Sequence, residues 1–353
     1  MTCQQSVTLD GDQQRCQDTN DNDTKHWLVL GDGDLSYSAS IAEELAKSNT
    51  RMVATVLEEE SVHNRVYERS TQNTKSIISS SGQHEVKFGI DATRLLDFFP
   101  ETKFDCIEFN FPHWRGKTNA KYNRELLDSF LGSASTVLKQ EGEIRVALCD
   151  GQGGMPAESL SQWRQSWMPA MYAAQHGLLL RRMIPYSPKY GLSSHRGVDR
   201  PFHLGKLPQK YFFAFPNHQP IDEDLQISCR HELRVMLHPE KLENSSISYD
   251  SIVDGDAVFE IGKEFIPKGI RFEIPARNLL TPYELKGGHV PLAVFLLNYS
   301  GESMPLTRQA ADDIRANIEA AIVEKWRLDI AKGGRLVSRP YPYHLLPTLI
   351  KEY

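Results

Sequence analysis

Residues 110–113, which read Asn-Phe-Pro-His, have side chains that can hold a planar ring and remove a proton from it. They follow directly after "FDCIEF", an apolar run of strand length. The amide of Asn110 can hydrogen-bond the edge of a base, and Pro112 stiffens the turn. The rings of His113 and Trp114 would face whatever lies above, and His113 can accept a proton. The stretch predicts group transfer to a ring nitrogen, with Asn110, Pro112 and His113 as catalytic candidates; a plain turn is the alternative.

A glycine-acid turn, "GDGDLS", follows the apolar run "HWLVL". Gly31 and Gly33 let the backbone take strained dihedrals and approach a ligand closely. A helix that begins near Ser36 would direct its first amide groups toward the same place. The dinucleotide pattern G-x-G-x-x-G has Ser36 instead of glycine at its last position. The turn therefore predicts a site for a nucleotide-like cofactor, with a tight structural turn as the alternative.

Acidic residues follow the first three predicted strands. Glu58 ends the second strand, where a carboxylate can bind a ribose diol. Asp91 ends the third strand beside Ala92 and can accept a hydrogen bond from an exocyclic amine such as that of adenine. Capping of the short helix that follows is the alternative for Asp91. The expected cofactor-binding residues are Gly31, Asp32, Gly33, Asp34, Ser36, Glu58, Asp91 and Ala92.

No metal site is predicted. Asp32 and Asp34 are not followed by a twelve-residue loop ending in glutamate, which a calcium loop would have. The five cysteines are scattered and none forms a C-x-x-C pair. This usage argues against zinc and a disulfide framework, and for a reducing compartment.

Apolar runs of strand length alternate with helix-length segments from residue 26 onward. This pattern predicts a doubly wound α/β sheet. The expected strands are 26–30, 51–57, 85–90, 104–111, 142–149, 178–184 and 210–215. The expected helices are 36–47, 60–80, 93–98, 120–139 and a segment over 158–177 interrupted at Pro169. Seven strands with a late antiparallel pair are the layout of class I (Rossmann-like) methyltransferases, an inference from fold analogy.

The composition changes after residues 215–224, which we interpret as a linker. Beyond it we expect strands at 231–237, 257–262, 270–274 and 290–301. One helix is expected over 307–326, with Thr307 as its N-cap. These elements predict a smaller α+β domain, so the expected organisation is a disordered tail (1–25), a Rossmann-like domain (26–216) and a C-terminal domain (217–353).

The net charge of −6 excludes general polyanion binding by the whole surface. Residues 181–210 nevertheless carry seven Lys or Arg against one Asp. Such a segment predicts either a focused contact with phosphates or a solvated loop. The chain has no apolar run of about 18 residues and no secretory signal, so we expect no membrane span and an intracellular location, cytoplasmic or nucleolar.

The motifs resemble a known family. "GDGDLSYS" is similar to the G-E-G-D-F-S-F-S signature of the 25S ribosomal RNA (uridine-N3) methyltransferase-like domain, and "DAT", "FNFPH" and "KYFFAF" fit in the same order. The resemblance covers residues 26–216. The loop "LCDGQGGMPA" and its W-x-x-x-W pair resemble a subgroup, the ferredoxin-fold anticodon-binding domain-containing proteins. The last 130 or so residues resemble a ferredoxin-like anticodon-binding domain, although strands are expected where that fold has its first helix.

The resemblance implies S-adenosylmethionine as cofactor, RNA (ribosomal or transfer) as partner, and methyl transfer to N3 of a uridine. It places the methionine end of the cofactor on the glycine turn, the ribose on Glu58, the adenine on Asp91 and the base at residues 110–113. Asp32 and Leu35 replace Glu and Phe of the signature. The family's "Y-P-G-Y-x-H-R-R" is here the longer, less basic segment 186–203.

Two other functions remain open at this point. An RNA-binding assembly factor could retain the fold without useful turnover. An NAD-dependent oxidoreductase is disfavoured by Ser36 at the third glycine position and by the absence of a hydride-transfer constellation.

Overall fold

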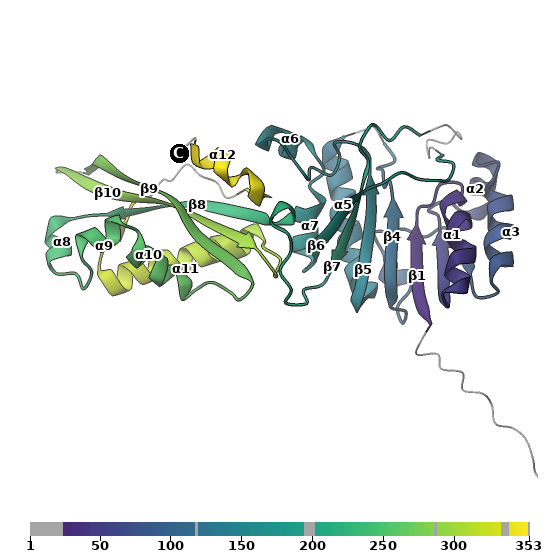
Figure 1. Cartoon of the computed structure of the whole chain (residues 1–353), viewed down its shortest axis with the longest axis horizontal. Helices are drawn as coiled ribbons and strands as arrows, with labels where there is room; N and C mark the ends of the chain where they lie inside the picture. The colour runs from purple at the N-terminus through teal and green to yellow at the C-terminus, as the bar shows by residue number, and fades with distance from the viewer. Residues whose placement is uncertain (1–23, 117–118, 194–201, 286–287, 333–338, 352–353) are drawn as a thin grey trace, which may run out of the picture.

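The computed structural model describes residues 24–116, 119–193, 202–285, 288–332 and 339–351. Two parts lie side by side along the long axis, one built on a mixed sheet and one on an antiparallel sheet (Figure 1). Among the described residues, no helix combines the length and apolarity needed to cross a membrane. Of the predicted tail, residues 1–23 lie outside the described residues, and Lys25 already opens the first strand.

The first sheet has the strand order β3-β2-β1-β4-β5-β7-β6, with β7 antiparallel to both of its neighbours. Its connections leave β1 toward β2 on one side and β4 on the other, so the topological switch point lies between β1 and β4. The order confirms the predicted class I methyltransferase sheet. Its strands are β1 (Lys25–Leu30), β2 (Thr50–Thr55), β3 (Glu85–Lys87), β4 (Phe104–Asn110), β5 (Leu138–Leu148), β6 (Leu179–Pro185) and β7 (Gln209–Ala214).

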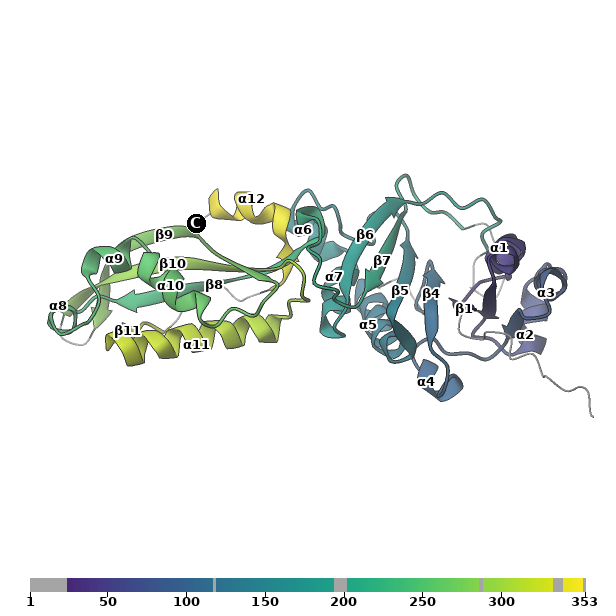
Figure 2. The same ribbon diagram turned by 60° about the horizontal axis from the view of Figure 1, so that its bottom comes forward.

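Helices cover both faces of this sheet, as Figure 2 shows. Successive residues of β1 face opposite sides, so Leu28 and Leu30 join one core while Val29 joins the other. Trp163 and Trp167, 1% and 5% exposed, are also in the core. The helices of this part are α1 (Ser36–Lys47), α2 (Glu60–Val66), α3 (Ser70–Ser80), α4 (Leu95–Phe98), α5 (Ala120–Val137), α6 (Leu160–Gln165) and α7 (Pro169–Gln175).

The single helix predicted over 60–80 is wrong, because α2 and α3 are separate. The chain leaves α2 in an extended conformation at Tyr67, whose side chain is 1% exposed. A hydrogen bond of 2.7 Å between His63 Nδ1 and Ser70 Oγ spans the break. Burial of an aromatic ring and a side-chain contact therefore override the local preference for one continuous helix.

The second sheet has the order β11-β8-β10-β9. Along the chain its elements run β-α-β-β-α-β, the order of the ferredoxin-like fold. Its strands are β8 (Ile227–Met236), β9 (Ile270–Leu285), β10 (Gly288–Gly301) and β11 (Asp329–Ile330), with β12 (Tyr341–Pro342) also on β8. The helices are α8 (Pro239–Glu243), α9 (Tyr249–Val253), α10 (Asp256–Lys263), α11 (Arg308–Trp326) and α12 (Leu346–Lys351).

The strand predicted at 257–262 is wrong, because these residues form α10. Ala257, Val258 and Ile261 are buried, a spacing that places them on one helical face. A six-residue apolar run is compatible with either period, so the sequence pattern was ambiguous there. α8 to α10 occupy the place of the first helix of the ferredoxin-like order. The expected N-cap of α11 is confirmed: Thr307 Oγ1 accepts a hydrogen bond of 3.1 Å from Ala310 N.

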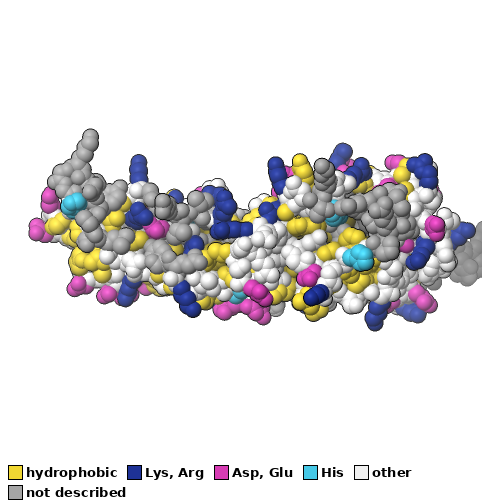
Figure 3. Space-filling model, turned by 90° about the horizontal axis from the view of Figure 1, so that it is seen from above, with side chains coloured by type: hydrophobic (Ala, Val, Ile, Leu, Met, Phe, Trp, Pro, Cys, Tyr) yellow, Lys and Arg dark blue, Asp and Glu magenta, His cyan; other side chains and the backbone are white. Residues whose placement is uncertain are grey.

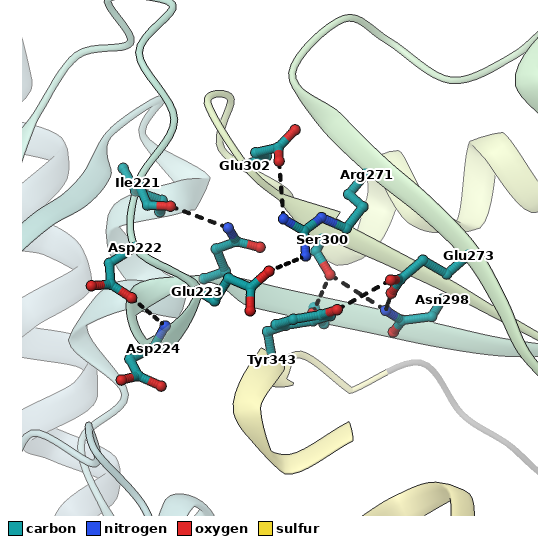
Figure 4. A network of polar contacts seen from close by, with 12 residues as sticks. Ile221, Asp222, Glu223, Asp224, Arg271, Glu273, Asn298, Ser300, Glu302 and Tyr343 are labelled. Carbon is teal, nitrogen blue, oxygen red and sulfur yellow. Dashed lines mark hydrogen bonds and ion pairs between the residues drawn. The ribbon is translucent and has the colours of Figure 1, made fainter. Parts of the chain in front are cut away.

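The segment expected as a linker is bound to the second sheet through polar contacts (Figure 4). Arg271 on β9 donates to Glu223 at 2.6 Å and to Glu302 at 3.0 Å. Tyr343, near the end of the chain, donates to Glu273 at 3.1 Å. Residues 215–224 are therefore more than a flexible spacer.

The end of the chain returns to the first part. Leu346 and Leu349 on α12 belong to the core that α5 shares with the first sheet. Trp163 Nε1 donates to Pro340 O at 2.9 Å, and α12 lies beside α6 in Figures 1 and 2. The last described residues thus connect the two parts. The predicted division at 216/217 stays a prediction.

Candidate active site

A cavity of about 140 Å³ lies at the carboxyl ends of β1, β2 and β4. This is the switch-point edge, where ligands bind in open α/β sheets. Nine of the candidate residues line it: Gly31, Asp32, Gly33, Asp34, Ser36, Glu58, Asn110, Pro112 and His113. The fold therefore brings the glycine turn and residues 110–113 together, although nearly 80 positions separate them.

The glycine turn forms the floor of the cavity. Gly31 has φ +57°, and a Cβ there would lie 2.7 Å from the Phe109 ring. Gly33 also has positive φ, +27°. Side chains rarely adopt this conformation, so glycine keeps both the turn and the open backbone surface.

Asp32 connects the turn to α1. Its carboxylate accepts hydrogen bonds from Tyr37 N at 3.3 Å and from Ser38 N at 2.7 Å, groups that have no partner within a helical first turn. Burial raises the pKa of Asp32 to about 7. Asp34 Oδ1 accepts from Ser36 N at 3.1 Å, while Asp34 Oδ2 is buried without a hydrogen-bond partner among the described residues. Two carboxyl groups thus line the cavity, and Asp32 is mostly ionised only above about pH 7.

Glu58 and Asp91 have different surroundings. Glu58 is half-buried just after β2 and lines the cavity. Asp91 Oδ1 instead accepts from Thr93 N at 2.9 Å and Thr93 Oγ1 at 2.7 Å, and Ala92 is buried in the core. Neither Asp91 nor Ala92 is among the described residues that line the cavity. These contacts close a local turn, and the capping alternative is wrong, because the N-cap of α4 is Arg94, without a side-chain cap hydrogen bond.

Asn110 ends β4 with an unsatisfied amide. Both Asn110 Oδ1 and Nδ2 are buried and have no hydrogen-bond partner among the described residues. A buried amide without partners costs about 1–3 kcal/mol, and such groups are rare outside functional sites. The next residue, Phe111, has φ +54°, which is unusual for an aromatic residue and is found where function maintains strain. The end of β4 is therefore arranged for a ligand with both a donor and an acceptor on one edge.

His113 and Trp114 behave differently. His113 lines the cavity, and its Nδ1 lies 2.6 Å from Trp114 O. Because a carbonyl can only accept, Nδ1 carries a proton, and in the neutral form of the imidazole the lone pair is on Nε2. The Trp114 ring stacks on Tyr122 at 5.6 Å and is not among the described lining residues, so the expectation that it faces the ligand is wrong.

A buried ion pair near the cavity was missed in the sequence. Lys210 Nζ on β7 donates to Glu108 Oε1 on β4 at 2.5 Å. The ammonium group also lies 3.9 Å from the ring centre of Tyr186 and 5.4 Å from that of Tyr37, a cavity residue. Burial lowers the pKa of Lys210. A buried glutamate within an apolar strand requires a cationic partner. The position of Glu108 in "FDCIEF" was therefore the feature of the sequence that could have predicted such a pair.

Aromatic rings and residues 190–193 cover the cavity. Tyr190 lies 5.1 Å from Tyr37, and Ser36 Oγ donates to Gly191 O at 2.6 Å. Nucleoside-sized ligands usually occupy sites of about 300 Å³ or more. We therefore expect residues 190–193 to be displaced when a ligand of that size enters.

The basic segment 181–210 has fewer available cations than its composition indicates. Arg181 donates to Gln219 O at 2.8 Å, Arg182 lies 3.7 Å from the Phe212 ring centre, and Lys210 pairs with Glu108. Residues 194–201 lie outside the described residues. Of these groups only Lys210 is neutralised by a carboxylate, whereas Arg181 and Arg182 keep their charge.

The sheet order and the cavity at its switch point define the class of the first part as a class I methyltransferase fold. Residues 28–191 match the family model described as "BMT5-like: rRNA (uridine-N3-)-methyltransferase BTM5-like". This match confirms, over that segment, the resemblance found in the sequence.

Curated relatives carry the name of the predicted subgroup. Human ferredoxin-fold anticodon-binding domain-containing protein 1 is 38% identical over 184 residues, 50% of this chain and 29% of that protein. Its mouse homolog is 31% identical over 268 residues, 70% of this chain and 42% of that protein. The chain therefore spans less than half the length of these relatives.

Solved structures also resemble the chain. TrmN from Thermus thermophilus is 18% identical with a TM-score of 0.32, covering 54% of this chain and 44% of that one. The 16S rRNA methyltransferase KamB is 14% identical with a TM-score of 0.36, covering 55% of this chain and 90% of that one.

Proposed function

We propose that the chain is an S-adenosylmethionine-dependent RNA methyltransferase that acts on N3 of a uridine in ribosomal or transfer RNA. The observation that carries this proposal is the unsatisfied Asn110 amide beside the glycine turn, within the segment that matches the BMT5-like family. The amide Nδ2 can donate to a carbonyl oxygen of uracil beside N3, which leaves N3 itself free to lose its proton and attack the methyl group.

The residues of the cavity fit this cofactor. Asp32 and Asp34 present carboxylates that attract its cationic groups, and the backbone at Gly31 and Gly33 allows close approach. Glu58 supplies two oxygens for the ribose hydroxyls. When bound, the cofactor supplies an electrophilic methyl group on a sulfonium. Asp91 and Ala92, which do not reach the described cavity, are left out of this proposal.

The protein's part in the chemistry is to orient the base and accept a proton. The ring nitrogen of uridine is a weak acid and attacks only after it loses its proton. Asn110 would hold the edge of the base, and the rigid turn at Pro112 would fix that position. His113, with its lone pair on Nε2, is the candidate base. In-line placement contributes further to the rate.

Two measurements test this function. Calorimetry should show binding of S-adenosylhomocysteine and none of NAD, and tritiated S-adenosylmethionine should label RNA from cells that lack the protein. Cofactor binding without labelling of any RNA would favour the assembly factor, and binding of NAD alone would favour the oxidoreductase. The expected intracellular location also stays a prediction.

A further inference from the structure

A second cavity, of about 420 Å³, lies where the two parts of the chain meet. Helices α6 and α7 form one wall, and residues 306–308 and 339–341 form another. We call it the arginine cleft, because five of its lining residues are arginines and none of the described ones is acidic. The five arginines are Arg124, Arg164, Arg230, Arg308 and Arg339.

Most of this positive charge is not neutralised. Arg308 pairs with Asp312 at 3.5 Å along α11. Within the described part of the chain, no carboxylate oxygen lies within 4.0 Å of the other four guanidinium groups. Closely placed like charges repel each other, so the arrangement favours an anionic ligand that sits between them.

Two of the arginines are held in position by groups that leave their charge intact. Arg124 Nε donates to the carbonyl oxygen of Ser166 at 2.9 Å. The Arg230 guanidinium lies 5.8 Å from the ring centre of Tyr341. Contacts of this kind orient a guanidinium in advance, which lowers the entropic cost of binding. Fixed guanidinium forks match the geometry of phosphate oxygens.

The remaining lining of the cleft is apolar and aromatic. Tyr172 is half-buried. Two methionines line the cleft with it: Met171 on α7, and Met168 directly before the first residue of α7. Trp163 contributes a buried ring whose Nε1 is committed to Pro340 O. Arginines above an aromatic and thioether wall suit a ligand that has both a phosphate and a planar ring. The volume falls in the range of sites for such ligands.

The cleft is close to the candidate active site. Ser166, which holds Arg124, precedes Trp167, and the Trp167 ring centre lies 6.3 Å from that of His113. His113 lines the first cavity and Arg124 lines the second. Figure 3 shows Lys and Arg side chains gathered near the middle of the long axis, where the two parts meet. Ser166 and Trp167 thus connect the two sites through the core of the first part.

We propose that the arginine cleft binds a nucleotide of the RNA substrate other than the methylated one, with its phosphate on the arginines and its base against Tyr172. The proposal rests on the proposed function only in taking RNA as the substrate. It assigns part of RNA binding to the junction of the two parts, rather than to the segment 181–210.

The test uses the full chain and a fluorescein-labelled oligouridylate of about twelve nucleotides, followed by fluorescence anisotropy. The double variant Arg164→Ala/Arg339→Ala removes two exposed arginines, so it should fold as the wild type does. We expect its Kd for the oligonucleotide to rise about tenfold, and the salt dependence of binding to weaken by about two phosphate contacts. The matched control is Arg51→Ala/Arg94→Ala, which removes two exposed arginines that pair with Glu85 and Asp97. The control should change the Kd less than about twofold.

A second variant distinguishes a nucleotide from any polyanion. Tyr172→Leu keeps an apolar wall but removes the ring, so it should weaken oligouridylate binding by about fivefold and leave binding of inorganic polyphosphate unchanged. An unchanged oligouridylate Kd in the arginine double variant would overturn the proposal. Equal effects of Tyr172→Leu on both probes, or on neither, would overturn the assignment of a nucleotide.

Failure of this inference is distinguishable from failure of the proposed function. The arginine double variant should bind S-adenosylhomocysteine as the wild type does, because the cleft contributes no residue to the first cavity. If the wild type methylates RNA and the double variant binds the oligonucleotide as tightly as the wild type does, only the proposal for the arginine cleft is contradicted. Absence of cofactor binding in the wild type contradicts the proposed function, whatever the cleft does.

Discussion

Asn110 has an environment that is unusual in a folded protein. Its amide is buried without a partner, at the end of a strand and beside a strained Phe111. Such an arrangement costs stability in the free protein and is maintained where a ligand supplies the missing partners.

Asn110→Ala should therefore separate activity from stability. We expect methyl transfer to fall about 10- to 100-fold, because hydrogen bonds to the base edge are lost in the transition state. The free energy of unfolding should stay the same or rise slightly, because an unsatisfied polar group is removed. Urea unfolding and single-turnover methylation measure the two effects. A variant that retains methyl transfer within about threefold would show that Asn110 does not hold the base.

Asp32 predicts a pH dependence of stability. Its pKa in the fold is about 7, above the ordinary value of 3.8, so the folded state binds a proton that the unfolded state releases. The resulting stabilisation is complete below the ordinary value and is lost as pH rises through about 7. Between about pH 5 and pH 8 the wild type should lose roughly 2–3 kcal/mol relative to Asp32→Asn, which cannot ionise. Urea unfolding at several pH values measures this difference. If the free energies of unfolding of the two proteins changed equally over this pH range, the raised pKa would be contradicted.

The sequence predicted residues whose position follows from the end of a strand. Gly31, Glu58 and Asn110 reach the cavity because parallel strands all end at one edge. Asp91 has the same kind of position, but a local contact with Thr93 satisfies it. The pair of Glu108 with Lys210 joins strands 102 positions apart, and only the fold reveals it.

At the level of elements, the glycine turn and α1 act as one unit. The turn is held by positive φ at Gly31, contact with Phe109 and the hydrogen bonds of Asp32. A change in the turn should therefore affect cofactor binding and stability together.

Gly31→Ala should lower the free energy of unfolding by about 1–3 kcal/mol and weaken S-adenosylhomocysteine binding more than about tenfold. The Cβ would be strained by φ +57° and crowded by Phe109. Gly177→Ala is the matched control, because φ is +75° there and no atom lies within 4 Å of a Cβ. It should cost only about 1 kcal/mol and leave cofactor binding intact. Equal binding by both variants, measured by calorimetry, would exclude the turn from the cofactor site.

The elements predicted best were those with a clear helical period, such as α1 and α11, and α11 also has the predicted cap, Thr307. Residues 257–262 failed because a short apolar run fits a strand or a helix equally well. The break between α2 and α3 was not predicted, because burial of Tyr67 is a tertiary effect.

For the whole molecule, the end of the chain joins the two parts. Leu346 and Leu349 enter the core of the first part, and His344 lies 2.7 Å from Ala157 O. This return could not be predicted from the sequence, because the pattern of a short helix carries no information about its distant partner. The arginine cleft depends on the same arrangement, since Pro340 and Tyr341 line it.

Leu349→Ala should lower the free energy of unfolding by about 2–4 kcal/mol, because its side chain is 1% exposed within the core of the first part. Thr348→Ala, one residue earlier and exposed, should change it by less than about 0.5 kcal/mol. Thermal and urea unfolding provide the comparison. If both variants matched the wild type, α12 would not be docked as the structure shows.

We propose that the cavity at the β1–β4 switch point serves methyl transfer to N3 of uridine. The most direct measurement is nucleoside mass spectrometry of RNA from cells lacking the protein, after incubation with the purified chain and S-adenosylmethionine that carries an isotopically labelled methyl group. We expect labelled 3-methyluridine with the wild type and almost none with Asn110→Ala. A label found only on another nucleoside, or equal labelling by both proteins, would contradict it.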